Sequence, residues 1–558
     1  MLYPKINHRR DVYNLNGVWE YAFVEEDYLP TAMNPNGKPM AVPASYNEIL
    51  TDMNMKEYSG KVLYEREFAV PKREDCLYRL RIGATSHKCE VYLNSEKIGE
   101  GINGFYPIDL PLEGLKEQNR LSIVIDNRLT AQTFPNGRIK NGKQLIQHDF
   151  YNYTGIHRDV LVYTLPKQHI DDVVIRTVVD GDYGKVSVEV RGEYKDIRYR
   201  VLNERGEEVV CSKENVFQIP DPVRWEVLNS YLYTLIVETD TDQYEEKFGI
   251  RKVEIKGTQF LVNDKPVYFK GFGMHEDFFV LGKGNNPAVT LRNFECMKWI
   301  NANSFRTSHY PYSEEVLDLA DRYGFLVIDE APAAGLVLWE ECFGENGANE
   351  ETLAIHKELM KRLYERDKNH PCVVMVSVSN EPQTTEKNSE KYFEEVFAYT
   401  RKFWEVPVTL VEPSLGYAHN SCVAKFSDVI CVNRYLGWYT NHGDLTVIEE
   451  KLTKDLTDFY EKYKKPVILS EFGADTIEGL HTLPAEGFSE DFQTFYIAEN
   501  CKVLDKLDFC IGEHVWNFAD FKTQQTTGRV RGNRKGVFTK ERQPKMAAYY
   551  LKERWKNK

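Results

Sequence analysis

The chain has 558 residues, of which 42% are hydrophobic, 13% aromatic and 28% charged. This balance is that of a folded protein with a large buried core, and it excludes a disordered, collagen-like or membrane-embedded chain. The 71 Lys and Arg against 85 Asp and Glu give a formal charge of −14, which argues against nucleic acid or an anionic membrane as the main partner.

The cysteine pattern and the first residues of the sequence predict where in the cell the protein is found. The ten Cys, from Cys76 to Cys510, include no C-x-x-C pair and none has a His at zinc-finger spacing, so we expect reduced thiols and no metal site. The first residues lack the apolar stretch of a signal peptide. No segment approaches the roughly 18 apolar residues of a membrane span. We therefore expect a cytoplasmic protein.

Short strands dominate the first part of the chain. Residues 61–70, 89–98 and 119–127 are rich in β-branched and aromatic residues, and apolar and polar residues alternate within 119–127. Their regular spacing predicts a β-sandwich up to about residue 168. Residues 169–252 continue in this manner and fit a small immunoglobulin-like sandwich, although no Cys-Trp-Cys pattern supports that choice.

The pattern changes at about residue 253, where helices begin to alternate with short apolar strands. Alternation over about 300 residues predicts parallel βα units, and this length suits one closed (β/α)8 barrel better than two small domains. The expected helices are 313–323, 351–368, 445–464 and 492–506, and the expected strands are 325–330, 372–381, 466–473 and 510–518.

Polar residues follow several strands of this half, and the C-terminal strand ends of a barrel share one face. Glycoside cleavage requires two facing carboxylates, and Glu381 and Glu471 are candidates for such a pair. The pattern alone does not separate them from Asp329 and Glu330, and each Glu could instead pair with an Arg at its strand end. The strand ends in question carry His309, Asp329, Glu330, Asn380, Glu381, Glu471 and Trp516.

Two motifs resemble those of glycoside hydrolase family 2. They are the Asn-Glu-Pro of residues 366–382 and the Glu-Phe-Gly of residues 470–476. Further segments narrow the resemblance to the bacterial β-glucuronidases of that family, and together they cover almost the whole chain. These segments are HDFYNYTGIHR (148–158), NRYLGWY (433–439), HVWNFADF (514–521) and 529–545.

The resemblance implies three domains and a set of roles. The domains are a jelly-roll sugar-binding-like domain (1–168), an immunoglobulin-like sandwich (169–252) and a catalytic barrel (253–558). Glu381 resembles the acid/base, Glu471 the nucleophile, and Tyr435 the residue that orients it. Asn380 would bind the sugar 2-hydroxyl and Asn433 would support the carboxylate end of the sugar. The residues implied to line the sugar subsite are Asp149, His309 and Trp516, and the role of Asp149 requires the first domain to reach over the barrel mouth.

The segment from Arg529 to Lys535 concentrates positive charge in an acidic chain. From charge alone a solvated basic loop is the favoured interpretation. The resemblance implies instead that Asn533 and Lys535 of an Asn-x-Lys motif, with Arg529, hold the C6 carboxylate of a uronic acid, for which charge-assisted donors are suited. A clamp of this kind would reject neutral sugars, because a buried Lys without its anion is costly.

The expected activity is retaining hydrolysis of small-molecule or oligosaccharide β-glucuronides without metal or organic cofactor, with Glu381 protonated near neutral pH. A β-galacturonidase, a family 2 enzyme for neutral sugars such as a β-galactosidase, and a non-catalytic carbohydrate-binding protein stay as alternatives. Self-association, often as a tetramer, is implied by the resemblance alone. The segment 331–358 is shorter than in many bacterial β-glucuronidases, which implies a more open leaving-group side.

Overall fold

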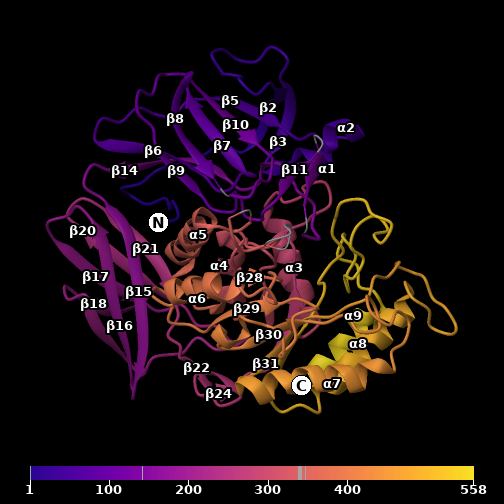
Figure 1. Ribbon diagram of the computed structural model, residues 1–558. Coiled ribbons are helices and arrows are strands. Elements are labelled where there is room, and N and C mark those ends of the chain that lie inside the picture. The colour runs from indigo at the N-terminus through magenta and orange to yellow at the C-terminus, as the bar shows by residue number, and fades with distance from the viewer. Residues whose placement is uncertain (1, 103, 141–142, 147, 337–341, 346) are drawn as a thin grey trace.

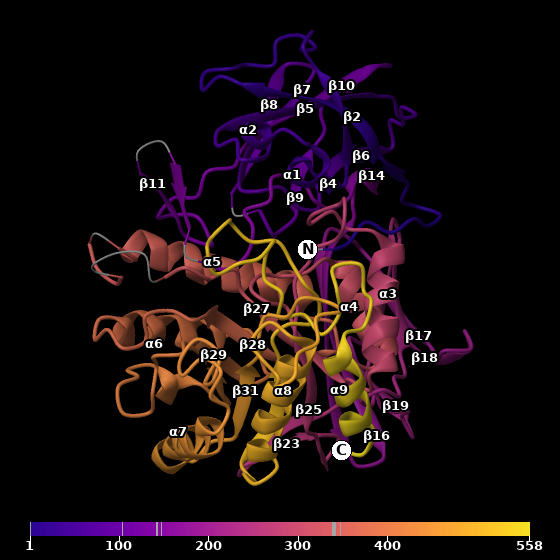
Figure 2. The same ribbon diagram turned by 90° about the vertical axis from the view of Figure 1, so that its right-hand side faces the viewer.

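The computed structural model describes residues 2–102, 104–140, 143–146, 148–336, 342–345 and 347–558. Figure 1 shows a β-sandwich of N-terminal strands at the top, a smaller sandwich at the left, and a barrel of strands and helices in the centre and right. In Figure 2 the yellow C-terminal loops rise from the barrel toward the first sandwich. None of the helices in the described ranges combines the length and apolar character needed to cross a membrane.

The first sandwich packs a six-stranded sheet, β3-β2-β5-β10-β7-β8, against a four-stranded sheet, β1-β14-β6-β9. The alternation in 119–127 places Leu121, Ile123 and Ile125 in its core, with none of their surface exposed. The expected strand 89–98 is two strands, because Asn94 and Ser95 adopt positive φ and reverse the chain. The strands are β1 (Val12–Asn14), β2 (Gly17–Val24), β3 (Lys38–Val42), β5 (Lys61–Phe68), β6 (Cys76–Ile82), β7 (Lys88–Leu93), β8 (Glu96–Ile102), β9 (Ile108–Pro111), β10 (Asn119–Asp126) and β14 (Val160–Pro166). Small elements beside them are β4 (Ala44–Ser45), α1 (Tyr46–Ile49), α2 (Met53–Lys56), β11 (Arg138–Lys140), β12 (Lys143–Leu145) and β13 (Gly155–Ile156).

The second sandwich packs β15-β16-β19 against β18-β17-β20-β21. Val186 and Val188 of the expected alternation are buried in its core. The fully buried Trp225 follows β19 and donates its indole N–H to the carbonyl of Asp321 at 2.8 Å, which ties this part of the chain to the barrel. The strands are β15 (Ile170–Asp180), β16 (Tyr183–Gly192), β17 (Ile197–Leu202), β18 (Glu208–Ser212), β19 (Val216–Pro220), β20 (Tyr233–Thr239) and β21 (Gln243–Phe248).

The third part is a closed barrel of eight parallel strands, β25 to β32, which confirms the expected fold class. A small antiparallel sheet of β22 (Val253–Lys256), β23 (Gln259–Val262) and β24 (Lys265–Pro266) precedes it. The barrel strands are β25 (Phe269–Gly273), β26 (Ser304–Arg306), β27 (Leu326–Glu330), β28 (Val373–Asn380), β29 (Val408–Glu412), β30 (Ile430–Asn433), β31 (Val467–Glu471) and β32 (Cys510–Val515). The helices are α3 (Pro287–Trp299), α4 (Glu314–Tyr323), α5 (Glu350–Asp367), α6 (Ser389–Thr400), α7 (Val447–Tyr463), α8 (Glu490–Leu504) and α9 (Met546–Lys556), with a 3-10 turn at Ala424–Phe426.

Local sequence signals account for the helix bounds. Helix α4 begins after Ser313, whose extended backbone occupies the N-cap position. It ends at Gly324, which has φ of +76° and donates its N–H to the carbonyl of Ala320. A β-carbon at Gly324 would lie 2.6 Å from the backbone nitrogen of Leu228, so glycine is required both by conformation and by the close approach of the chain after β19.

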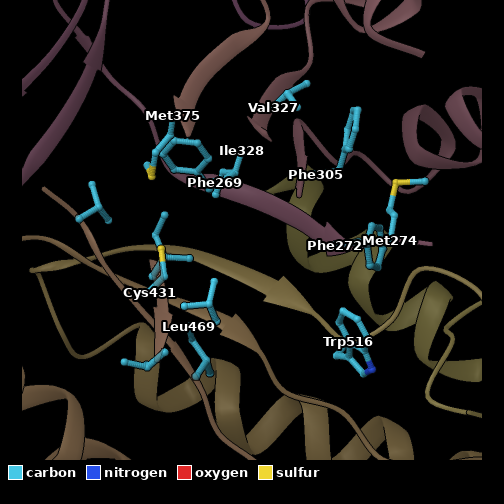
Figure 3. Close-up of a cluster of buried hydrophobic side chains, with 14 of the residues drawn as sticks. Phe269, Phe272, Met274, Phe305, Val327, Ile328, Met375, Cys431, Leu469 and Trp516 are labelled. Atoms are coloured by element: carbon cyan, nitrogen blue, oxygen red, sulfur yellow. The ribbon is translucent and has the colours of Figure 1, made fainter. Parts of the chain in front are cut away.

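Apolar side chains fill the interior of the barrel. Figure 3 shows Phe269, Met375, Cys431 and Leu469 from four different strands pointing into one cluster, and all of them are buried. Strands of a barrel are covered on both faces, so they appear in the sequence as continuous apolar runs rather than as alternating ones. The buried charged side chains of Arg306, Glu330 and Glu471 stand at the C-terminal ends of their strands.

The side chain of Arg158 connects the first sandwich to the barrel by hydrogen bonds. Its guanidinium donates to the carbonyls of Phe105 (2.9 Å) and Pro311 (2.7 Å) and lies 3.3 Å from the carboxylate of Glu276. Nearby, the N–H of Tyr151 donates to the carbonyl of Lys522 at 3.0 Å. The segment 148–158 of the first sandwich is thereby held over the barrel mouth.

Trp555 of α9 packs against the barrel strands β25 and β32, where its ring lies 5.2 Å from that of Phe272 and its N–H donates to Glu513 at 2.6 Å. We expect Trp555→Ala to destabilise the protein by about 3–5 kcal/mol, because it leaves a large cavity. Urea unfolding would measure this loss, with Glu553→Ala, an exposed position on the same helix, as the control. Equal stability of the two variants would contradict a role for α9 in the barrel core.

Candidate active site

A cavity of about 470 Å³ opens at the C-terminal ends of the barrel strands. Residues of the first sandwich and of the barrel both line it, so neither part makes it alone. It is lined by His148, Asp149, His309, Ala334, Gly335, Asn380, Glu381, Gln383, Thr385, Pro413, Ser414, Leu415, Asn420, Tyr435, Tyr439, Glu471, Trp516 and Arg529. Of the residues predicted from the sequence, Asn433, Asn533 and Lys535 do not line it.

Glu471 ends β31 and is held on both carboxylate oxygens. Arg306 donates to Oε1 at 2.5 Å, and the hydroxyl of Tyr435 donates to Oε2 at 2.6 Å. The residue is only 4% exposed. Two donors therefore set the orientation of the carboxylate, and the residue still lines the cavity.

Arg306, which sequence reasoning missed, joins two carboxylates. Its second guanidinium nitrogen donates to both oxygens of Glu330, at 2.7 and 2.9 Å. Burial lowers its pKa, but Glu330 and Glu471 raise it above the usual range, so the side chain stays charged. The available signal was a charged residue inside the buried strand β26, since a buried arginine almost always has an anionic partner.

Glu381 follows β28 with φ of +47°, a left-handed conformation that is rare for residues other than glycine. Its N–H donates to the carbonyl of Val411 at 2.9 Å, and its Oε1 accepts from the amide of Asn433 at 3.0 Å. Asn433 in turn accepts from the hydroxyl of Ser470 at 2.9 Å. The structure thus places Asn433 beside Glu381, and its hydrogen bonds do not go to the basic segment.

Burial raises the pKa of both Glu381 and Glu471, and the charge of Glu381 raises that of Glu471 further. Two carboxyls in one buried site cannot both ionise readily, so near neutral pH they hold one proton between them. Arg306 and Tyr435 favour the anion on Glu471, whereas Glu381 accepts a single amide hydrogen bond. The hydrogen bonds from Arg306 and Tyr435 oppose the rise in the pKa of Glu471, which burial and Glu381 nevertheless bring to about 8.

His309 and Trp516 form one wall, with their rings stacked at 5.1 Å. His309 Nδ1 lies 2.9 Å from Glu330, and its Nε2 lies 3.8 Å from Glu471. Burial lowers the pKa of His309 to about 4 despite the contact with Glu330, so the imidazole is neutral. It can donate from Nδ1 to Glu330 and accept at Nε2 from a hydroxyl group in the cavity.

The residues Arg529, Asn533 and Lys535, which we name the anion clamp, lie together around Asp149 and Asp475. Lys535 has no exposed surface; its ammonium pairs with Asp475 and donates to the hydroxyl of Tyr439 at 2.8 Å. Burial lowers its pKa to about 8 against the opposing effect of Asp475. The side-chain oxygen of Asn533 accepts from the N–H of Lys535 at 3.1 Å, which fixes the turn.

Asp149 reaches the anion clamp from the first sandwich. Arg529 donates to both of its carboxylate oxygens, at 3.1 Å for Oδ1, and Asn533 donates to Oδ2 at 2.8 Å. Arg529 also contacts Asp475 at 3.0 Å and Tyr439 at 2.5 Å. Tyr439 and Asp475 were not predicted, although each stands four residues after a predicted site residue.

The segment 331–358 borders the cavity through Ala334 and Gly335. Its residues 337–341 and 346 lie outside the described residues, so the expected openness of the leaving-group side stays a prediction.

Within the described part of the chain, Asp321, His370 and Cys372 have ligand atoms within 4.8 Å of one another, as a metal site would. However, Asp321 pairs with His370 at 2.5 Å and raises its pKa to about 10 despite burial. This is an ion pair at the N-terminal end of β28, away from the cavity.

Comparison with known proteins identifies relatives along the whole chain. Residues 12–166 match the family model of the glycosyl hydrolases family 2 sugar binding domain, 168–251 that of glycosyl hydrolases family 2, and 253–558 that of the family 2 TIM barrel domain. The β-glucuronidase of Paenibacillus borealis is 41% identical, covering 100% of this chain and 98% of that protein. The structure of an uncultured Clostridium sp. β-glucuronidase matches with a TM-score of 0.97 at 43% identity, covering 100% of both chains. A Ruminococcus gnavus β-glucuronidase in complex with uronic isofagomine matches with a TM-score of 0.95 at 36% identity, covering 99% of both chains.

We expect Arg306→Met to lower the stability by about 3–5 kcal/mol, because it leaves Glu330 and Glu471 buried without their cation. Urea unfolding would measure the loss, with Arg322→Met, an exposed position on α4, as the control. The double variant Arg306→Met/Glu330→Gln should recover part of the loss, since one buried charge is removed with its partner. A single variant as stable as the control would contradict the role of Arg306 as a shared counter-charge.

Proposed function

This chain belongs to glycoside hydrolase family 2, and we propose that it is a retaining β-glucuronidase. It hydrolyses β-D-glucuronides to D-glucuronate and an aglycone through a covalent glycosyl-enzyme. The observation that carries this proposal is that the buried Glu471 and the half-buried Glu381 line one cavity together with Arg529 of the anion clamp. Full-length similarity to β-glucuronidases supports the same conclusion.

The first step forms the glycosyl-enzyme. An oxygen of ionised Glu471 attacks the anomeric carbon, the bond to the leaving oxygen breaks, and Glu381 gives its proton to that oxygen. Arg306 and Tyr435 hold the attacking carboxylate in place before the reaction. Both donors are preorganised, so the step requires little rearrangement of the site.

The second step releases the sugar. Esterification removes the charge of Glu471, so the pKa of Glu381 falls and Glu381 becomes a base. It takes a proton from water, the water oxygen attacks the anomeric carbon, and the bond to Glu471 breaks. Glu381 is then protonated again and Glu471 ionised, as at the start.

We assign the remaining residues to positioning. Asn433 orients Glu381 through its amide, in place of the contact with the sugar carboxylate that the sequence led us to expect. Trp516 offers a flat surface for the sugar ring, and neutral His309 accepts from a sugar hydroxyl. Asn380, which lines the cavity, is assigned to the 2-hydroxyl.

We assign substrate selectivity to the anion clamp. A C6 carboxylate matches its ammonium, guanidinium and amide donors, whereas the hydroxymethyl group of glucose or galactose would leave them without an anion. The anion clamp reads the carboxylate and not the configuration at C4, so β-galacturonides are the second candidate substrates.

We also propose domain boundaries, a location and an oligomeric state for this chain. The domain boundaries at 168/169 and 252/253 are supported by the grouping of the sheets and by the matched family models. A cytoplasmic location rests on the cysteine pattern. Self-association, as a tetramer, rests on resemblance to the family.

Hydrolysis of matched aryl β-glucuronide, β-galacturonide, β-glucoside and β-galactoside by wild type and Lys535→Ala tests the function. We expect wild type to prefer a uronide, and the variant to lose roughly 10²- to 10³-fold in kcat/KM on it, because a buried charged partner is removed. Equal or better turnover of a neutral sugar would assign the chain to another family 2 activity. Uronide binding without turnover of any substrate would leave a carbohydrate-binding role.

Tyr435→Phe should move the acid limb of the pH profile of kcat/KM upward by about one to two units. That limb reports ionisation of Glu471, whose pKa the Tyr435 hydrogen bond lowers, and a bond to a charged group contributes about 1.5–3 kcal/mol. The alkaline limb, where Glu381 loses its proton, should stay in place. Tyr439→Phe, whose hydroxyl contacts the anion clamp, serves as the control and should not move the acid limb. A shift of both limbs, or of neither, would contradict the assignment.

A further inference from the structure

A buried carboxylate that the proposed mechanism does not use adjoins the cavity. Glu412 ends β29 and is 1% exposed, and the next residue, Pro413, lines the cavity. Its Oε2 accepts from the hydroxyl of Thr384 at 2.7 Å, and its Oε1 accepts from the hydroxyl of Ser421 at 2.7 Å. Burial raises the pKa of Glu412, and these two hydrogen bonds oppose that rise. A carboxylate at this depth is costly unless its oxygens are hydrogen-bonded, so each hydroxyl is an important partner.

Glu412 is held in place by the chain that follows it. The guanidinium of Arg434 donates to the carbonyls of Pro413 at 2.9 Å and Gly416 at 2.6 Å. A β-carbon at Gly416 would clash with Oε2 of Glu412, so this loop packs directly against the carboxylate and limits its rotation. Glu412 is therefore a rigid acceptor for the hydroxyl groups that reach it.

Thr384 connects Glu412 to the proposed acid/base. It stands three residues after Glu381, and its N–H donates to the carbonyl of Pro382 at 2.7 Å, so the connection is a tight turn. Glu381 has φ of +47°, and such a conformation persists in a residue other than glycine only where surrounding contacts impose it. Before the turn, the N–H of Glu381 donates to the carbonyl of Val411 at 2.9 Å. After the turn, Thr384 donates to Glu412, so two consecutive residues of β29 hold it from both sides.

We propose that Glu412 is a positioning residue for the acid/base: through Thr384 it holds Glu381 where the leaving oxygen is protonated. The inference rests on the proposed function and deepens it, because it names what places the proton donor. Glu381 transfers the proton, and Glu412 acts through the short chain between them. A displacement of about 1 Å at a reacting group can cost on the order of 10²-fold in rate, even when the change lies outside the reacting groups.

The position of the acid/base matters for leaving groups that need a proton. An alkoxide leaves poorly unless it is protonated, whereas 2,4-dinitrophenolate is stable enough to leave without a proton. Because kcat/KM reports the steps up to formation of the glycosyl-enzyme, the later role of Glu381 as a base does not enter it. A displaced Glu381 should therefore lower kcat/KM for an alkyl glucuronide and spare that for a dinitrophenyl glucuronide.

Values of kcat/KM for wild type, Thr384→Val and Ser421→Ala on methyl and 2,4-dinitrophenyl β-D-glucuronide test the proposal. Each variant removes one hydroxyl bound to Glu412, so each leaves a buried carboxylate oxygen without that donor. We expect Thr384→Val to lose roughly tenfold to hundredfold on the methyl glucuronide and less than about twofold on the dinitrophenyl glucuronide. Ser421→Ala is the matched control: its ratio between the two substrates should equal that of wild type, whatever loss of stability urea unfolding records.

Each other outcome overturns a defined statement. An equal loss on both substrates, or no loss, in a folded Thr384→Val protein would overturn the positioning role and leave the proposed function intact. A selective loss in Ser421→Ala would show that any disturbance around Glu412 suffices, and would overturn the assignment to the connection through Thr384. If Thr384→Val fails to fold, Thr384→Val/Glu412→Gln, which leaves no buried charge without its donor, takes its place under the same two outcomes. Wild type that hydrolyses neither glucuronide would overturn the proposed function and the inference with it.

Discussion

The guanidinium of Arg306 is the charge on which the barrel mouth depends. It has no exposed surface and binds Glu330 and Glu471 at the same time. Ionised carboxylates are costly to bury unless they are paired and hydrogen-bonded. Without this cation, Glu471 would have only the hydroxyl of Tyr435 to stabilise its anion. The same side chain therefore stabilises the fold and lowers the pKa of Glu471 against the raising effect of burial.

The anion clamp also contains charges that need partners, and its partner carboxylate comes from another region of the chain. Its residues belong to the barrel, but the carboxylate that completes it comes from Asp149, 380 residues before Arg529. The first sandwich is fixed to the barrel by Arg158 and by the segment around Tyr151. The cavity is thus complete only when both parts are folded and joined, and the proposed function gives the first sandwich a part in recognition.

Several details of the site differ from the expectations because they depend on side-chain packing. Asn433 was expected at the sugar carboxylate, but β30 and β31 place it between Ser470 and Glu381. Arg306 was not singled out, because a three-residue strand carries too little periodicity to show which way its side chains point.

The sequence by itself determined the architecture and the chemistry. Apolar alternation, continuous apolar runs and helix-ending residues such as Gly324 encode which elements form, because burial and backbone conformation are local properties. The motifs around Glu381 and Glu471 indicated the reaction. Only the tertiary structure decided which side chains share a proton, a cation or a clamp, because such contacts join residues that are distant in the chain and depend on packing to within an ångström. The pairing of Asp149 with Arg529 is the clearest case, since no local pattern relates the two positions.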